Sequence, residues 1–190
     1  MFDLDRARMA GVGGTLLSFF APFLLGILFI LAGAVGFFEV EVPLSSAISW
    51  VLIGYAVWKL SGISNDPRIF TLYLAYVAFG AAGDAVFLWG NLVPSQTGTL
   101  AYLLGENVTR VAAGVFLYLS FARIASKLGY DLFLWAGRFV LIAAVAEVTT
   151  YFDTPFSLFV LGLSLVAFVL EVLSFNSLRV KAPTPGTTMS

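Results

Sequence analysis

Five ionisable side chains lie inside segments that are otherwise apolar enough to cross a membrane. They are Asp84, Glu106, Arg110, Glu147 and Glu171. A charge at the centre of a bilayer costs about 2.5 kcal/mol or more on insertion scales, so such residues face protein or water and pair where they can. Their types predict either a buried charge network or a path for protons or cations.

The depth of each charged residue along its helix predicts which of them meet. Asp84 and Glu147 lie about 14 and 15 residues from the inner ends of their helices, which rise about 1.5 Å per residue. Glu106 reaches nearly the same layer from the opposite direction, and Arg110 shares its helix face because residues four apart are neighbours. We therefore expect these four residues in one layer of the outer half, and Glu171 outside that layer, in the inner half.

This layer contains more acids than bases. If Arg110 pairs with one or two carboxylates, another one has to be protonated or hydrated, because a buried carboxylate beside a like charge is unfavourable. One interpretation is a proton- or cation-binding site. The other is a structural network that locks three helices together, with Asn107 and Thr109 as further donors or acceptors.

The composition indicates an integral membrane protein. Of the 190 residues, 60% are hydrophobic and 11% charged, whereas soluble domains have about 45–50% apolar and about 25% charged residues. The chain has no histidine or cysteine, which excludes imidazole and thiolate metal ligands, disulfides, cysteine nucleophiles and histidine bases. We expect no catalytic activity and no cofactor or metal. The net charge of -1 offers no reason to expect nucleic acid.

Six apolar stretches approach the length of about 20 residues that crosses a hydrocarbon core of about 30 Å. They cover 15–38, 44–62, 69–92, 99–125, 132–152 and 156–176. The predicted fold is an all-α, polytopic membrane bundle of six helices. A single transmembrane domain covers 1–181 and a flexible cytoplasmic tail covers 182–190.

Helix-boundary residues support these spans. Pro43, Pro67 and Pro155 each predict a first helical residue. Gly129 followed by Asp131 predicts the end of one helix and the start of the next. Apolar sequence before the first span predicts either one span kinked at Pro22 or a short interfacial helix followed by a span.

The basic residues predict an orientation. Nine of the ten Lys and Arg residues fall on one side of a six-span arrangement, whereas Glu39, Glu41 and Asp153 lie on the other. Cytoplasmic loops are enriched in Lys and Arg, so we expect both termini in the cytoplasm.

Small residues predict where helices pack closely. Gly14, Ser18 and Gly26 recur at multiples of four residues on the first span, and Gly80 and Gly83 lie on the third. Such faces pack against another helix of the same protein or against a partner.

The connection from 58 to 70 resembles the one from 122 to 133. Lys59 or Arg123 closes one helix, a polar turn and an aspartate follow, and an aliphatic residue with a phenylalanine opens the next. An internal duplication and shared turn rules both account for this likeness.

Three segments carry a resemblance to a known family. The glycine-rich 11–17, the connection 59–70 and the later 125–133 resemble small archaeal multi-span membrane proteins grouped as domain of unknown function 996. Residues 39–43 are extra length relative to that pattern. The resemblance implies an archaeal plasma membrane and supplies no activity or functional residue.

The leading functional hypothesis is a non-catalytic accessory or assembly subunit of a larger membrane complex. The loops are too short for a soluble domain, and small-residue faces lie beside the charge layer. Its partners are the lipid bilayer and a membrane protein or a second copy of the chain. The alternative is a small transporter or channel for protons or cations, which assembles alone around a polar cavity.

Overall fold

The computed structural model describes residues 2–31, 38–93, 100–150 and 156–178, which form helices and no strand. The helices are α1 (Phe2–Leu31), α2 (Phe38–Ser64), α3 (Pro67–Leu92), α4 (Leu100–Leu128), α5 (Asp131–Thr150) and α6 (Phe156–Asn176). Within these ranges, four segments are long and apolar enough to cross a membrane: Ala47–Ser64, Pro67–Gly90, Gly105–Leu128 and Leu158–Asn176. The predicted all-α class is confirmed, and these four segments support a membrane protein. The predicted tail 182–190 lies outside the described residues.

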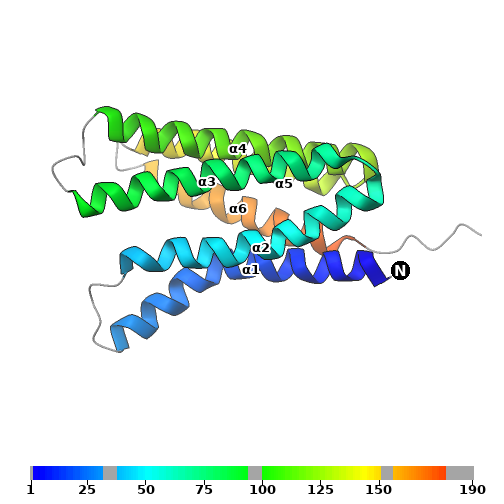
Figure 1. Cartoon of the computed structure of the whole chain (residues 1–190), viewed down its shortest axis with the longest axis horizontal. Helices are drawn as coiled ribbons and strands as arrows, with labels where there is room; N and C mark the ends of the chain where they lie inside the picture. The colour runs from blue at the N-terminus through cyan, green and yellow to red at the C-terminus, as the bar shows by residue number, and fades with distance from the viewer. Residues whose placement is uncertain (1, 32–37, 94–99, 151–155, 179–190) are drawn as a thin grey trace, which may run out of the picture.

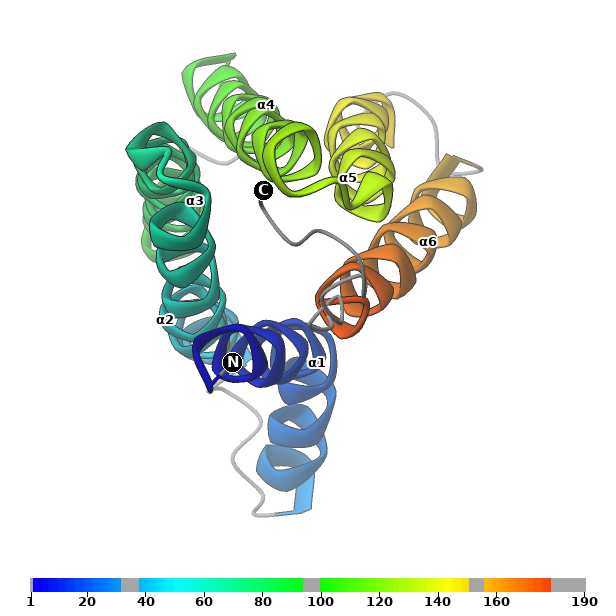
Figure 2. The ribbon, with the colours of Figure 1, turned by 90° about the vertical axis from the view of Figure 1, so that its right-hand side faces the viewer.

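The six helices form a ring in the order of the sequence. Each helix packs against the next, and α6 contacts α1, which closes the ring (Figure 2). The α2–α3 and α4–α5 turns lie at the same end of the molecule as the start of α1 (Figure 1). We call this end the hairpin end and the opposite one the far end.

The first two helices differ in how they compare with the sequence-based expectations. α1 is one continuous helix from Phe2, which agrees with the alternative of a single kinked helix, whereas the start predicted for the second helix needs correction. α1 bends along its length (Figure 1), which the missing backbone donor of Pro22 explains. α2 begins at Phe38, so Pro43 lies inside the helix and not at its first residue. The sequence left residues 39–43 between two predicted spans, whereas the structure includes them in α2. Pro155 falls outside the described residues.

The α2–α3 and α4–α5 turns share one backbone geometry. Asn65 and Gly129 both have positive φ, at 52° and 72°. In the first turn, the Asp66 carbonyl accepts a hydrogen bond from the Ile69 N–H at 3.2 Å. In the second, the Tyr130 carbonyl accepts one from the Phe133 N–H at 3.1 Å. Asp66 is the N-cap of α3 and Pro67 is its first residue, as predicted. The predicted likeness therefore extends to the backbone, but Tyr130 occupies the position that Asp66 occupies in the first turn.

Apolar side chains fill the ring at the hairpin end. Three phenylalanines meet there edge to face, with Phe133 and Phe175 at 5.1 Å between ring centroids and Phe121 at 5.3 Å from Phe133. We call this cluster the apolar plug. Its buried members include Ala7, Leu60, Ile69, Phe121, Ile124, Phe133 and Phe175. Every helix contributes to it, so the plug closes one end of the ring.

Polar contacts surround this end. Arg123 on α4 pairs with Asp66 at 3.0 Å, and Lys59 on α2 pairs with Asp3 on α1 at 2.9 Å. Burial raises the pKa of Asp66, but hydrogen bonds from the Arg68 N–H and the Arg123 guanidinium outweigh it, so this pKa lies below its ordinary value of 3.8. The hydrogen bond and the charge of Lys59 likewise lower the pKa of Asp3.

Replacing Gly14 tests the close packing of α1 on α2. A Cβ atom there would lie 2.9 Å from the Leu52 Cβ and 3.0 Å from the Ile53 backbone nitrogen, whereas a Cβ at Gly13 meets nothing within 4 Å. We expect Gly14→Ala to destabilise the fold by about 1–3 kcal/mol. Gly13→Ala should be neutral or stabilising by up to about 1 kcal/mol. Thermal unfolding in detergent measures both, and equal effects would contradict this packing.

The Asp66 carboxylate should make stability depend on acid pH. Because its pKa is lowered in the folded state, its stabilisation is complete well above pH 3.8 and is lost as the pH falls through the folded pKa. We expect Asp66→Asn to lower the melting temperature at pH 7 and to flatten the loss of stability in acid. Asp131→Asn, at the exposed start of α5, is the matched control and should leave both unchanged. Identical acid profiles for wild type and Asp66→Asn would rule out this role.

Candidate functional site

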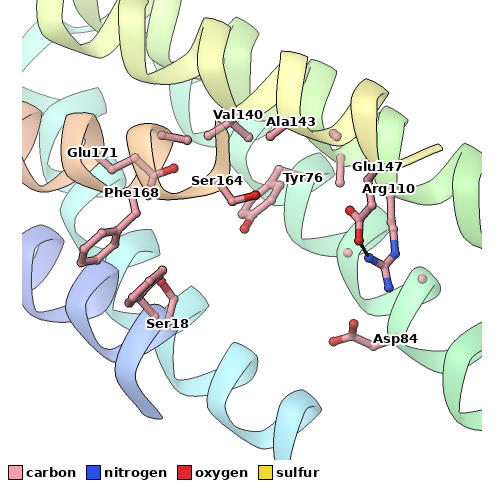
Figure 3. Close-up of a pocket in the computed structure, with 17 residues that line it drawn as sticks. Ser18, Tyr76, Asp84, Arg110, Val140, Ala143, Glu147, Ser164, Phe168 and Glu171 are labelled. Carbon is pink, nitrogen blue, oxygen red and sulfur yellow. Dashed lines mark hydrogen bonds and ion pairs between the residues drawn. The ribbon is translucent and has the colours of Figure 1, made fainter. Parts of the chain in front are cut away.

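A polar cavity of about 440 Å³ lies inside the ring (Figure 3). All helices except α2 contribute to its wall. The polar side chains that line it are Ser18, Tyr76, Asp84, Arg110, Glu147, Ser164 and Glu171. A second cavity of about 190 Å³ shares Ser18, Tyr76 and Glu171 with the first and reaches Phe121 of the apolar plug. The polar space therefore adjoins the plug and extends from it toward the far end.

Small residues on the inner faces of the helices create this space. Each wall follows helical spacing, as in Tyr76, Gly80 and Asp84 on α3 and Ser164, Phe168 and Glu171 on α6. The small members of the wall are Gly80, Gly83, Ala113, Gly114, Ala143, Ala144 and Ala167. Side chains of this size cannot meet across the ring, so an interior volume remains.

Arg110 joins two carboxylates on neighbouring helices. Its guanidinium donates to Glu106 of its own helix at 2.8 Å and to Glu147 of α5. The Glu106 side chain is 4% exposed, whereas those of Arg110 and Glu147 are each 38% exposed and line the cavity. The structure thus brings together three of the four residues that the sequence assigned to one layer, and the contact ties α4 to α5.

Asp84 lies on the wall of the same cavity without joining that pairing. Its Oδ2 atom is buried and has no hydrogen-bond partner among the described residues. Thr109, expected to support the network, donates its hydroxyl to the backbone carbonyls of Gly105 and Glu106 instead. A hydroxyl inside a helix often bonds to its own preceding turn, which explains this difference. The carboxylate of Asp84 is therefore available to a proton, a cation or water in the cavity.

Glu171 lines both cavities as well. Figure 3 shows it across the cavity from Asp84, Arg110 and Glu147, with Tyr76 between them. Depth along the helix predicted that Glu171 lies outside the layer of the other residues, and the cavity extends along the ring axis, so it collects acids from two depths.

The small residues predicted for helix packing act within this molecule. Gly14 allows α1 to contact α2, and a Cβ atom at Gly80 would lie 2.9 Å from the Trp50 ring. At Gly83 a Cβ atom would lie 3.0 Å from the Thr109 hydroxyl, so this glycine brings α3 close to α4. Ser18 lines the cavity, and the side-chain surroundings of Gly26 are not among those described.

Sequence reasoning missed Tyr76, Ser164 and Phe168. Their signal was present as helical spacing: Tyr76 precedes Asp84 by eight residues, and Ser164 precedes Glu171 by seven. Residues at these separations share one helix face. A search for polar and aromatic residues in phase with the buried acids would have found them.

The cavity carries an excess of acid. Among its described lining residues, Arg110 is the one base and faces Asp84, Glu147 and Glu171. An unpaired carboxylate away from bulk water needs water, a proton or a cation. No three acidic side chains converge closely enough to hold a metal ion in the described part of the chain. The geometry is therefore suited to binding protons or small cations at separate carboxylates.

No protein-family model, curated protein or solved structure matches this chain. The resemblance to the archaeal family stays a prediction.

Removing Arg110 tests the network. Arg110→Met removes the guanidinium that pairs with the buried Glu106 carboxylate, and we expect a loss of about 1–3 kcal/mol in unfolding free energy. The double variant Glu106→Gln/Arg110→Met should recover part of that loss because the buried charge of Glu106 is removed as well. Arg138→Met, which removes an exposed arginine of α5, is the control. A double variant no more stable than Arg110→Met would argue against the pairing. Thermal unfolding in detergent supplies the measurement.

Proposed function

We propose that the protein carries protons or small cations across a membrane through the polar cavity in its helix ring. The observation that carries this proposal is the excess of carboxylates around a cavity of about 440 Å³. It favours the transporter alternative of the sequence analysis over the accessory-subunit hypothesis, because a polar cavity inside the bundle is what distinguishes the two. Intramembrane carboxylates that face a cavity are typical of proton and ion pathways.

The polar groups are spread along the direction of transport. Asp84 lies 17 residues from the start of α3, which is about 26 Å along that helix, and Tyr76 lies about 14 Å along it. Glu171 is five residues from the hairpin end of α6. The Tyr76 hydroxyl accepts a hydrogen bond from Trp50 at 3.2 Å, and Tyr76 lines the cavity between these depths. Asp84 and Glu171 then serve as two binding stations, with hydroxyl groups between them.

The apolar plug favours a carrier over an open channel. Phe121, Phe133 and Phe175 close the ring beyond Glu171, and an ion cannot cross packed aromatic rings without their movement. Release at the hairpin end therefore requires the helices to shift there. Binding from one side of the membrane and release to the other after the helices move is the alternating access expected of carriers.

The proposal includes the predicted topology of six spans in a plasma membrane with both termini in the cytoplasm. α1 and α5 complete the ring between the four helices that contain candidate membrane spans, which supports their crossing as well. Lys59 and Arg123 meet their acidic partners at the hairpin end. A basic hairpin end fits the cytoplasmic side under the positive-inside rule.

Flux through purified protein in liposomes tests the function. With a proton gradient and then Na⁺ and K⁺ gradients imposed, we expect uptake of at least one of these ions by the wild type. Asp84→Asn and Glu171→Gln should each reduce it by about tenfold or more, because loss of one charged contact costs at least about 1.4 kcal/mol of binding. Asp131→Asn should transport like the wild type. Ala144→Phe should block flux by filling the cavity, whereas Ala82→Phe on the exposed side of α3 should not.

Absence of flux for all three ions in folded, reconstituted wild type would reject this function. Equal flux in Asp84→Asn, Glu171→Gln and Asp131→Asn would reject the assigned stations. Native mass spectrometry after mild extraction tests the accessory-subunit hypothesis. A stoichiometric complex with another membrane protein, together with no flux by the isolated chain, would favour that hypothesis.

A further inference from the structure

A second hollow lies on the outside of the ring, between α2 and α3. It measures about 540 Å³ and is lined by exposed apolar side chains such as Val51, Trp58 and Leu74. Val51 is 71% exposed, so this surface faces outward and not into the cavity. We call it the α2–α3 groove.

The polar atoms of the groove are directed away from it. The Tyr73 hydroxyl donates to the Trp50 carbonyl at 2.7 Å, and the Trp50 indole N–H donates to the Tyr76 hydroxyl at 3.2 Å. Tyr76 lines the polar cavity on the other side of this wall. The aromatic rings consequently present carbon atoms to the groove, which suits a hydrocarbon chain.

The length of the groove matches one leaflet of a bilayer. From Ala47 to Trp58 the lining of α2 covers 11 helical steps, or about 16 Å. This is about half of a hydrocarbon core of about 30 Å. A partner helix that crosses the membrane would need a contact face along the whole span, so the length favours an acyl chain.

The groove becomes polar at the hairpin end. There it meets a hollow of about 400 Å³ lined by Ser61, Asn65 and Thr71, and the two share Trp58 and Phe70. Tryptophan is enriched at the level of lipid headgroups. This hollow therefore lies where the groove would place a headgroup.

Two basic residues lie near this polar end. The Lys59 ammonium lies 4.9 Å from the centroid of the Trp58 ring, but its charge is already paired with Asp3 at 2.9 Å. Arg68, in the first turn of α3, is exposed and has no ion-pair partner among the described residues, since the neighbouring Asp66 pairs with Arg123. Positive charge at the headgroup level complements a phosphate.

We propose that the α2–α3 groove binds an anionic phospholipid. One acyl chain lies along Val51, Leu74 and the aromatic floor, and the phosphate lies at the hairpin end near Arg68. The site is separate from the polar cavity, so it is independent of the proposed transport.

Native mass spectrometry of the purified full chain tests this site. The protein is incubated with phosphatidylglycerol or with phosphatidylcholine of identical acyl chains, and retained lipid is counted. We expect one preferentially retained phosphatidylglycerol in the wild type. Arg68→Ala should weaken its retention by about fivefold, and Val51→Trp should abolish it by filling the groove.

Matched controls separate this site from general adhesion of lipid. Arg138→Ala removes an exposed arginine that lies over Trp135 on α5, and Leu161→Trp enlarges an exposed residue of α6. Both should retain phosphatidylglycerol like the wild type, and thermal unfolding verifies that every variant is folded. Equal retention of the two lipids by the wild type would overturn the proposal. So would equal losses in the α5 control and in Arg68→Ala, or a co-purifying protein displaced by Val51→Trp.

Discussion

The Arg110 guanidinium, held between Glu106 and Glu147, is the interaction on which the interior of this protein depends. It compensates a nearly fully buried carboxylate and joins α4 to α5 at the cavity wall. With Arg110 so engaged, no further base remains among the described lining residues for Asp84 or Glu171. Because unpaired carboxylates are unfavourable away from water, the same pairing that stabilises one part of the wall makes the rest of it a site for protons or cations.

The aromatic wall formed by Trp50, Tyr73 and Tyr76 separates two hollows of opposite chemistry. Its polar atoms bond to one another and face the ring interior, where Tyr76 meets the acids. The ring carbon atoms of Trp50 and Tyr73 face outward and line the α2–α3 groove. A single set of hydrogen bonds thus accounts for both the polar cavity and the apolar groove. Gly54 and Gly80 allow the rings to lie close to the backbones of α2 and α3.

Local rules in the sequence succeeded where short-range chemistry decides. Asp66 and Pro67 start α3 because a carboxylate caps the first turn and proline needs no donor there. The pairing of Arg110 with Glu106 follows from their spacing of four residues. The helix start predicted at Pro43 was wrong because several residues in 38–43 could begin a helix, and the sequence alone does not show which one does. The role predicted for Thr109 in the charge network differs from the structure because its hydroxyl bonds to backbone carbonyls of its own helix.

By itself the sequence determined that this is a helical membrane protein with acids and one arginine inside apolar segments, since hydropathy and helical period are properties of the chain alone. It could not determine that Glu171 shares a cavity with Asp84, or that Tyr76 and Ser164 lie between them. Those relations depend on how each helix is rotated and on how the ring closes between α1 and α6. Rotation and closure are decided by packing between residues far apart in sequence, and small residues on the inner faces of α3, α4, α5 and α6 made the result a cavity and not a filled core.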